Sequence, residues 1–189
     1  MSDRIWADRL GEWIAWNHQE VEESVRGVAP ELAHVRPSPS APSVAFHAWH
    51  IGRWVDRNGA AISGWLDPTA PHEEVWLARG LTERWGLAGV ALGDFGGTGA
   101  GLDGSASAAL ALPDIDQVLD YVIGASIALE AVLARIDDDA ILERTVVDLY
   151  GDEATIGELI LNHLFHADRH LGMIEALRGV LGERGTATV

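Results

Sequence analysis

The sequence predicts an all-α protein, a four-helix bundle, for three reasons. First, four long stretches place apolar residues at the 3.6-residue period of an amphipathic helix, and strand-like alternation is nearly absent. Second, the connections between these stretches are rich in proline or glycine, which interrupt helices. Third, a length of 189 residues favours a single domain, residues 1–189, with a sizeable core.

The first helix is predicted over residues 3–28, where Trp6, Leu10, Ile14 and Val21 fall on one face. A proline-rich connection follows and cannot continue the helix. Ser43 is expected to cap the start of the second helix, which is predicted to end near residue 65, before an Asp-Pro pair.

The middle of the chain has weaker patterns. A short amphipathic segment is expected at residues 73–86, and a flexible insertion at about residues 88–112. The glycine run at residues 96–101 lacks the lysine, the preceding strand and the spacing of a phosphate-binding loop, so we expect a mobile loop. A frayed tail is expected at about residues 183–189.

The remaining helices have clear start signals. The third helix is predicted over residues 113–136, because a proline opens it and acidic residues occupy its first turn. A short extended piece is expected at residues 144–149. Thr155 and Glu158 have the spacing of a capping box, so the fourth helix is predicted to run from there to about Leu181.

Histidines lie on the apolar faces of two of these helices. His163, His166 and His170 occupy the face of the fourth helix where leucine is expected, and His47 and His50 lie on the second. Burying a polar ring without a partner costs about 1–3 kcal/mol, so a shared partner is expected. Facing helices with histidines at this spacing can converge on one metal ion, and three ligands leave a position for water or substrate. Periodicity leaves open whether His47 or His50 binds.

Other side chains are candidates for supporting roles. Asp56 and Glu130 are candidates for a catalytic base. Glu130 can instead orient a ligand histidine or lie at the solvent boundary. Tryptophans of the first half are expected to wall part of the cavity beside the metal: Trp13, Trp16, Trp49 and Trp54.

Composition excludes several classes of function. The chain has no cysteine, and its thirteen basic residues are all arginine, which excludes thiolate ligands, a cysteine nucleophile and Schiff-base chemistry. A formal net charge of −16 argues against nucleic acid and anionic membranes as partners. No apolar run is long enough to span a bilayer. A cytoplasmic protein acting on a small molecule is therefore expected.

The histidine motifs resemble those of a known superfamily. Residues 49–56 (Trp-His-Ile-Gly-Arg-Trp-Val-Asp) and residues 166–172 (His-x-x-x-His-x-Gly) are similar to the DinB/YfiT-like metalloenzymes. Residues 150–157 and 80–87 resemble the actinobacterial members, some of which use the thiol mycothiol. The resemblance covers most of the chain, although the middle region departs from it.

This resemblance implies a four-helix bundle, often dimeric, with a divalent metal on one histidine of helix two and two of helix four. Carried over by position, the ligands are His50, His166 and His170. Similar sequences often have an aliphatic residue at the position of His47, which favours His50 as the ligand. His163 is then expected to lie beside the site. Characterised members of the superfamily are thiol-dependent transferases and isomerases.

Three functions remain in competition. The leading hypothesis is an enzyme that binds zinc or nickel, with a low-molecular-weight thiol such as mycothiol on the metal. The alternative is a metal-dependent hydrolase in which Asp56 or Glu130 acts as base toward a metal-bound water. A third possibility is a non-catalytic metal-binding or stress-response protein.

Overall fold

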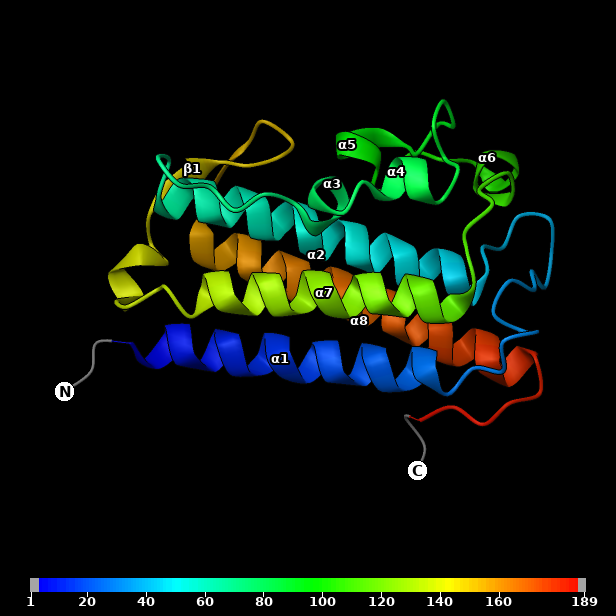
Figure 1. Ribbon diagram of the computed structural model, residues 1–189. Helices are drawn as coiled ribbons and strands as arrows, with labels where there is room; N and C mark the ends of the chain where they lie inside the picture. Colours follow the sequence, from blue (N-terminus) through cyan, green and yellow to red (C-terminus); the bar gives the residue numbers. More distant parts are fainter. Residues whose placement is uncertain (1–3, 187–189) are drawn as a thin grey trace.

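The computed structural model describes residues 4–186 and confirms the all-α bundle. Its four long helices lie side by side: α1 (Ile5–Arg26), α2 (Val44–Leu66), α7 (Ile115–Leu133) and α8 (Ile156–Val180) (Figure 1). α2 packs mainly on α7 and also on α8, while α1 packs on α7 and α8. Within the described residues, no helix is long and apolar enough to cross a membrane.

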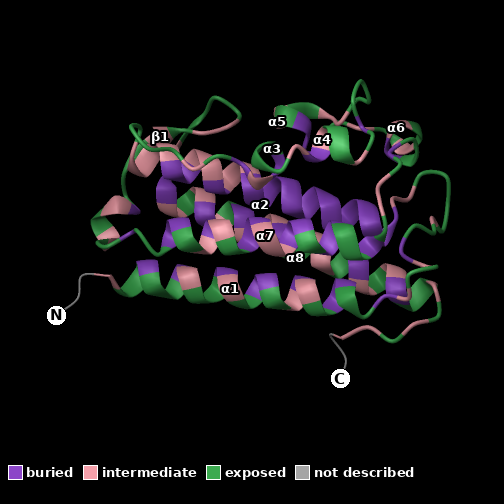
Figure 2. Ribbon diagram, viewed as in Figure 1, coloured by how far each residue is buried: buried purple, intermediate pink, exposed green. Residues whose placement is uncertain are grey.

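Shorter elements lie along the outer side of α2. Figure 2 shows α2 buried over most of its length, whereas α1 has an exposed side. The segment predicted to be a flexible insertion includes α5 and α6, and part of it is buried against α2. These shorter elements are α3 (Val75–Ala78), α4 (Leu81–Arg84), α5 (Asp94–Gly97) and α6 (Gly104–Ala108), whereas the 3-10 helix η1 (Asp139–Ile141) lies against α1.

The starts of α2 and α8 follow the predicted capping signals. The Ser43 hydroxyl accepts a hydrogen bond from the Phe46 N–H at 3.2 Å. Thr155 and Glu158 form the reciprocal capping box, with Glu158 accepting from the Thr155 N–H at 2.8 Å and donating its own N–H to the Thr155 hydroxyl at 3.2 Å. Such caps typically contribute about 1 kcal/mol each.

A small hairpin precedes α8. β1 (Thr145–Val147) pairs antiparallel with β2 (Glu153–Thr155), with Thr145 opposite Thr155. The first strand falls inside the extended piece predicted at residues 144–149, but the sequence predicts no strand at residues 153–155. Three residues carry too little alternation to signal a strand, so pairing across the turn decides their conformation. The hairpin sets where α8 begins.

The predicted tail is only partly described. Residues 187–189 of the expected tail at 183–189 lie outside the described residues. Glu183 accepts a hydrogen bond from the Ala29 N–H at 2.8 Å, so the start of this segment is tied to the end of α1.

Candidate metal centre

α2 and α8 bring His50, His166 and His170 together. One ring nitrogen from each histidine lies within 4.8 Å of the other two. The Nε2 atoms of His50 and His166 are 3.2 Å apart, and the ring centroid of His170 lies 4.5 Å from that of His50. His166 and His170 are one helical turn apart, so they share one face of α8. Three imidazole nitrogens at this separation form a group that can hold a metal ion.

Burial keeps these rings neutral near pH 7. Desolvation, followed by repulsion from His50, lowers the pKa of His166 to about 4 and that of His170 to about 3. Desolvation also lowers the pKa of His50. A metal ion binds the neutral imidazole, so no proton has to be displaced from these residues at neutral pH. The donor set therefore fits a divalent transition metal.

The orientation of His50 is set by a backbone carbonyl. The Nδ1–H of His50 donates to the Thr98 carbonyl at 2.5 Å, because a carbonyl oxygen can only accept. This leaves the Nε2 lone pair directed at His166. Histidines that bind metals commonly donate their other N–H in this way. At Gly99, φ is +88° and a Cβ atom would lie 2.8 Å from the Trp49 ring, so only glycine allows the loop to approach this closely.

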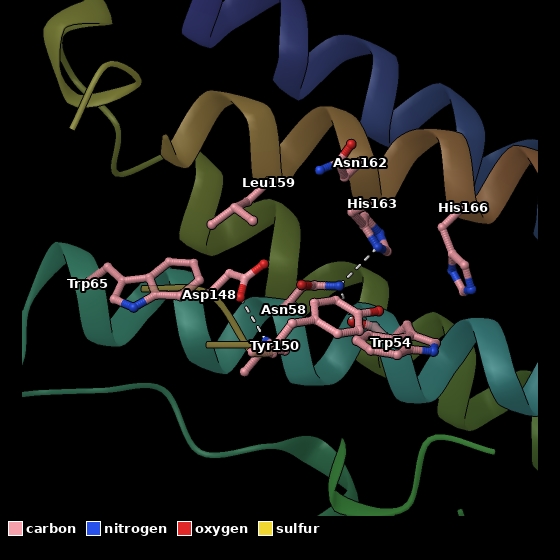
Figure 3. A pocket seen from close by; sticks show the side chains of 10 residues that line it. Trp54, Asn58, Trp65, Asp148, Tyr150, Leu159, Asn162, His163 and His166 are labelled. Carbon is pink, nitrogen blue, oxygen red and sulfur yellow. Dashed lines mark hydrogen bonds between the residues drawn. The ribbon is translucent and has the colours of Figure 1, made fainter. Parts of the chain in front are cut away.

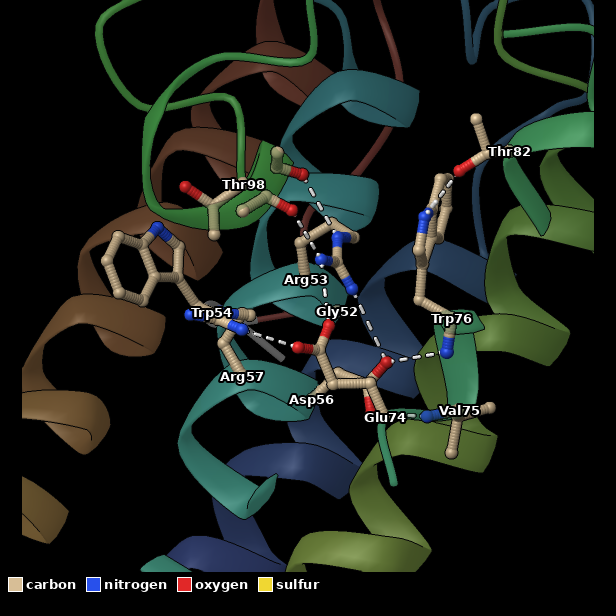
Figure 4. Close-up of polar contacts among 12 residues, drawn as sticks. Gly52, Arg53, Trp54, Asp56, Arg57, Glu74, Val75, Trp76, Thr82 and Thr98 are labelled. Carbon is tan, nitrogen blue, oxygen red and sulfur yellow. Dashed lines mark hydrogen bonds and ion pairs between the residues drawn. The ribbon is translucent and has the colours of Figure 1, made fainter. Parts of the chain in front are cut away.

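Arg53 holds this loop in place (Figure 4). Its guanidinium donates to the Gly97 carbonyl at 3.0 Å and the Gly96 carbonyl at 2.8 Å. It also pairs with Glu74 at 2.9 Å and donates to the Tyr121 hydroxyl at 3.2 Å. The hydrophobic pattern of the sequence does not indicate this support. The available signals were the glycine run at residues 96–101 and an arginine three residues after His50.

Asp56 does not take the position of a base at the metal centre. It is 1% exposed, and it accepts hydrogen bonds from the N–H groups of Val75 and Trp76, each at 2.8 Å. The Tyr121 hydroxyl donates to it at 3.1 Å. Its carboxylate therefore holds the start of α3 against α2 (Figure 4), and none of its hydrogen bonds among the described residues is to a histidine of the group.

Glu130 orients a different histidine from those of the predicted centre. Its carboxylate lies 2.7 Å from Nδ1 of His18, which is 5% exposed on α1. The His18 ring in turn lies edge-on to His163, with centroids 6.2 Å apart. Glu130 thus binds His18, which contacts His163, and not a histidine of the three-histidine group. Sequence periodicity gave no indication that α1 would supply the histidine that Glu130 contacts.

The two remaining candidate histidines have different positions. Nδ1 of His47 lies 2.9 Å from Nδ1 of His170, so His47 contacts the group through one of its members. His163 is 4% exposed, and its Nδ1 accepts from the Asn58 amide at 3.3 Å. Desolvation, followed by repulsion from nearby histidines, lowers the pKa of His163 to about 3. Neither residue belongs to the three-histidine group.

A cavity of about 100 Å³ adjoins His166 (Figure 3). Trp54 lines it, while Trp49 is fully buried beside Phe46. The expectation that Trp13, Trp16 and Trp49 also form its wall is wrong, because none of them lines it, and Trp13 and Trp16 are 41% and 64% exposed on α1. Besides His166, its wall includes aromatic rings, amides and a carboxylate, contributed by Trp54, Trp65, Tyr150, Asn58, Asn162 and Asp148.

The fold and this site define a helical bundle with an inward-facing group of histidines that can bind a metal. The sequence profile of the DinB superfamily matches residues 14–174, and the chain belongs to that superfamily. A crystal structure of a conserved protein from Enterococcus faecalis has a similar fold, with a TM-score of 0.71 at 19% identity, covering 93% of this chain and 97% of the other. No curated protein is significantly similar in sequence.

Proposed function

We propose that this chain is a metal-dependent enzyme in which His50, His166 and His170 hold one divalent ion, zinc or nickel. The ion, when bound, favours the thiolate of a low-molecular-weight thiol such as mycothiol, the cofactor of a transferase or isomerase. The observation that carries the proposal is a group of three histidines beside a cavity. A structural zinc is closed by four protein ligands, whereas three leave a position for an exchangeable group.

The chain's own residues would orient the site and exclude water. The carbonyl of Thr98 holds the proton of His50 on Nδ1, which keeps Nε2 free for the ion. Since the chain has no cysteine, the thiol has to come from solution. The hydrolase alternative has less support, because the carboxylates of Asp56 and Glu130 are bound elsewhere. A purely structural metal does not account for the adjoining cavity.

The proposal predicts that a thiol binds the metal directly. In protein substituted with Co(II), mycothiol or 2-mercaptoethanol is expected to produce a sulfur-to-cobalt absorption band in the near ultraviolet. Ethylene glycol, which has oxygen in place of sulfur, is the matched control and should leave the spectrum unchanged. A fourth protein side chain on the metal, together with no spectral response to thiols, would show that the site is structural.

We also propose that the protein is a homodimer, supported by the apolar rings that α1 exposes. Trp6, Trp13 and Trp16 are 60%, 41% and 64% exposed, and large exposed aromatics often mark an interface. Light scattering is expected to give twice the mass of one chain, and Trp16→Glu to give a monomer. The control is Ile127→Glu, at an exposed apolar residue of α7. A monomeric wild-type protein contradicts the proposal.

A further inference from the structure

The cavity beside His166 combines aromatic rings with one acidic side chain (Figure 3). Trp54 and Trp65 come from α2, and Tyr150 and Asp148 come from the hairpin before α8. None of the ten described residues that line it is an arginine, and the chain contains no lysine. Arg144 and the neighbour of His166, Arg169, are not among them. The cavity therefore has a negative counter-charge and no fixed positive one.

Asp148 is held rigidly at this position by the hairpin. Its Oδ1 atom accepts the N–H groups of Tyr150 and Asp152 at 2.8 and 2.9 Å. The Asp148 N–H donates to the Asp152 carbonyl at 2.8 Å, which closes the turn. Its Oδ2 atom accepts no hydrogen bond from the described residues. One carboxylate oxygen thus remains available to a ligand.

The aromatic rings are also fixed relative to one another. Trp54 and Tyr150 are nearly parallel, with planes 20° apart and centroids 6.1 Å apart. Phe95 lies edge-on to Tyr150 at 4.5 Å, which supports a tyrosine that is otherwise 63% exposed. The faces of such rings are electronegative and attract cations, most strongly for tryptophan. Aromatic faces and a carboxylate together recognise ammonium groups.

We infer that this cavity binds a small organic cation, an ammonium group, carried by the substrate. This inference rests on the proposed function, because His166 belongs both to the cavity wall and to the three-histidine group, so the bound ammonium group would lie next to the metal centre. At about 100 Å³ the cavity is smaller than the sites that take drug-sized ligands, so the cation is an alkylammonium rather than a large ring system. The chain's net charge of −16 also attracts such a ligand over longer distances.

Choline and its neutral analogue 3,3-dimethyl-1-butanol test the charge requirement. Calorimetric titration of the metal-loaded and the metal-free protein is expected to show binding of choline and at least about tenfold weaker binding of the alcohol. Asp148→Asn should weaken choline binding by about tenfold while leaving the alcohol unaffected, because the amide keeps the Oδ1 acceptor but loses the charge. Asp152→Asn, on the same hairpin with the same change of charge, is the matched control.

Tyr150 provides a second test that does not involve the acid. Tyr150→Leu is expected to weaken choline binding, and Tyr150→Phe to retain it, since the ring and not the hydroxyl faces the cation. Equal affinity for choline and the alcohol, or equal losses in Asp148→Asn and Asp152→Asn, overturns the inference. If the thiol response of the cobalt protein persists in that case, the proposed function stands and only the cation site fails.

Discussion

Replacing His50, His166 or His170 with alanine is expected to abolish tight metal binding. The wild-type protein should carry about one transition-metal ion per chain by elemental analysis, because the three rings form one group. Each alanine variant should bind the metal at least about a hundredfold more weakly. This loss exceeds the 10- to 100-fold that typically follows removal of a residue that only hydrogen-bonds to a metal ligand. Chelator competition measures the affinity.

His47→Ala and His163→Ala are the matched controls for this experiment. Both rings are buried near the group but outside it, so their removal should weaken metal binding by about tenfold or less. The melting temperature of each metal-free variant separates loss of ligands from loss of the fold. Tight binding by His50→Ala together with none by His47→Ala would assign the helix-two ligand to His47 instead.

Arg53→Met is expected to destabilise the metal-free protein by about 3 kcal/mol or more, because it leaves buried partners uncompensated. The Arg53 side chain is 1% exposed and holds Glu74 together with the carbonyls of Gly96 and Gly97. The same change should also weaken metal binding by about tenfold, since this loop carries the Thr98 carbonyl that orients His50. Urea unfolding measures the first effect and chelator competition the second.

Arg57→Met is the matched control for Arg53→Met. The Arg57 side chain pairs with the same carboxylate, Glu74, at 2.6 Å, but it is 29% exposed and its pair is expected to contribute less than about 1 kcal/mol. If the two variants unfold at the same urea concentration, the buried network around Arg53 does not stabilise the fold as argued. If Arg53→Met keeps wild-type metal affinity, the loop does not orient His50.

Several features of the fold follow from local sequence. The hydroxyls of Ser43 and Thr155 cap the helices whose starts they signal, because a cap needs only a few neighbouring residues. The four-residue spacing of His166 and His170 places both on one face of a helix whatever surrounds them. The absence of lysine and cysteine likewise excludes whole reaction classes without a structure.

The contacts around the site depend on how distant segments meet. His47 and His50 differ by only about 60° around α2, and the packing of α2 on α8 decides which of them joins the three-histidine group. Periodicity did not indicate that the Thr98 carbonyl would accept a hydrogen bond from His50. Nor did it indicate that the hairpin would bring Asp148 into the cavity. Local sequence determines which face of a helix is apolar. A contact between residues that are dozens of positions apart forms only when the helices pack, because helix rotation and loop closure depend on the whole core.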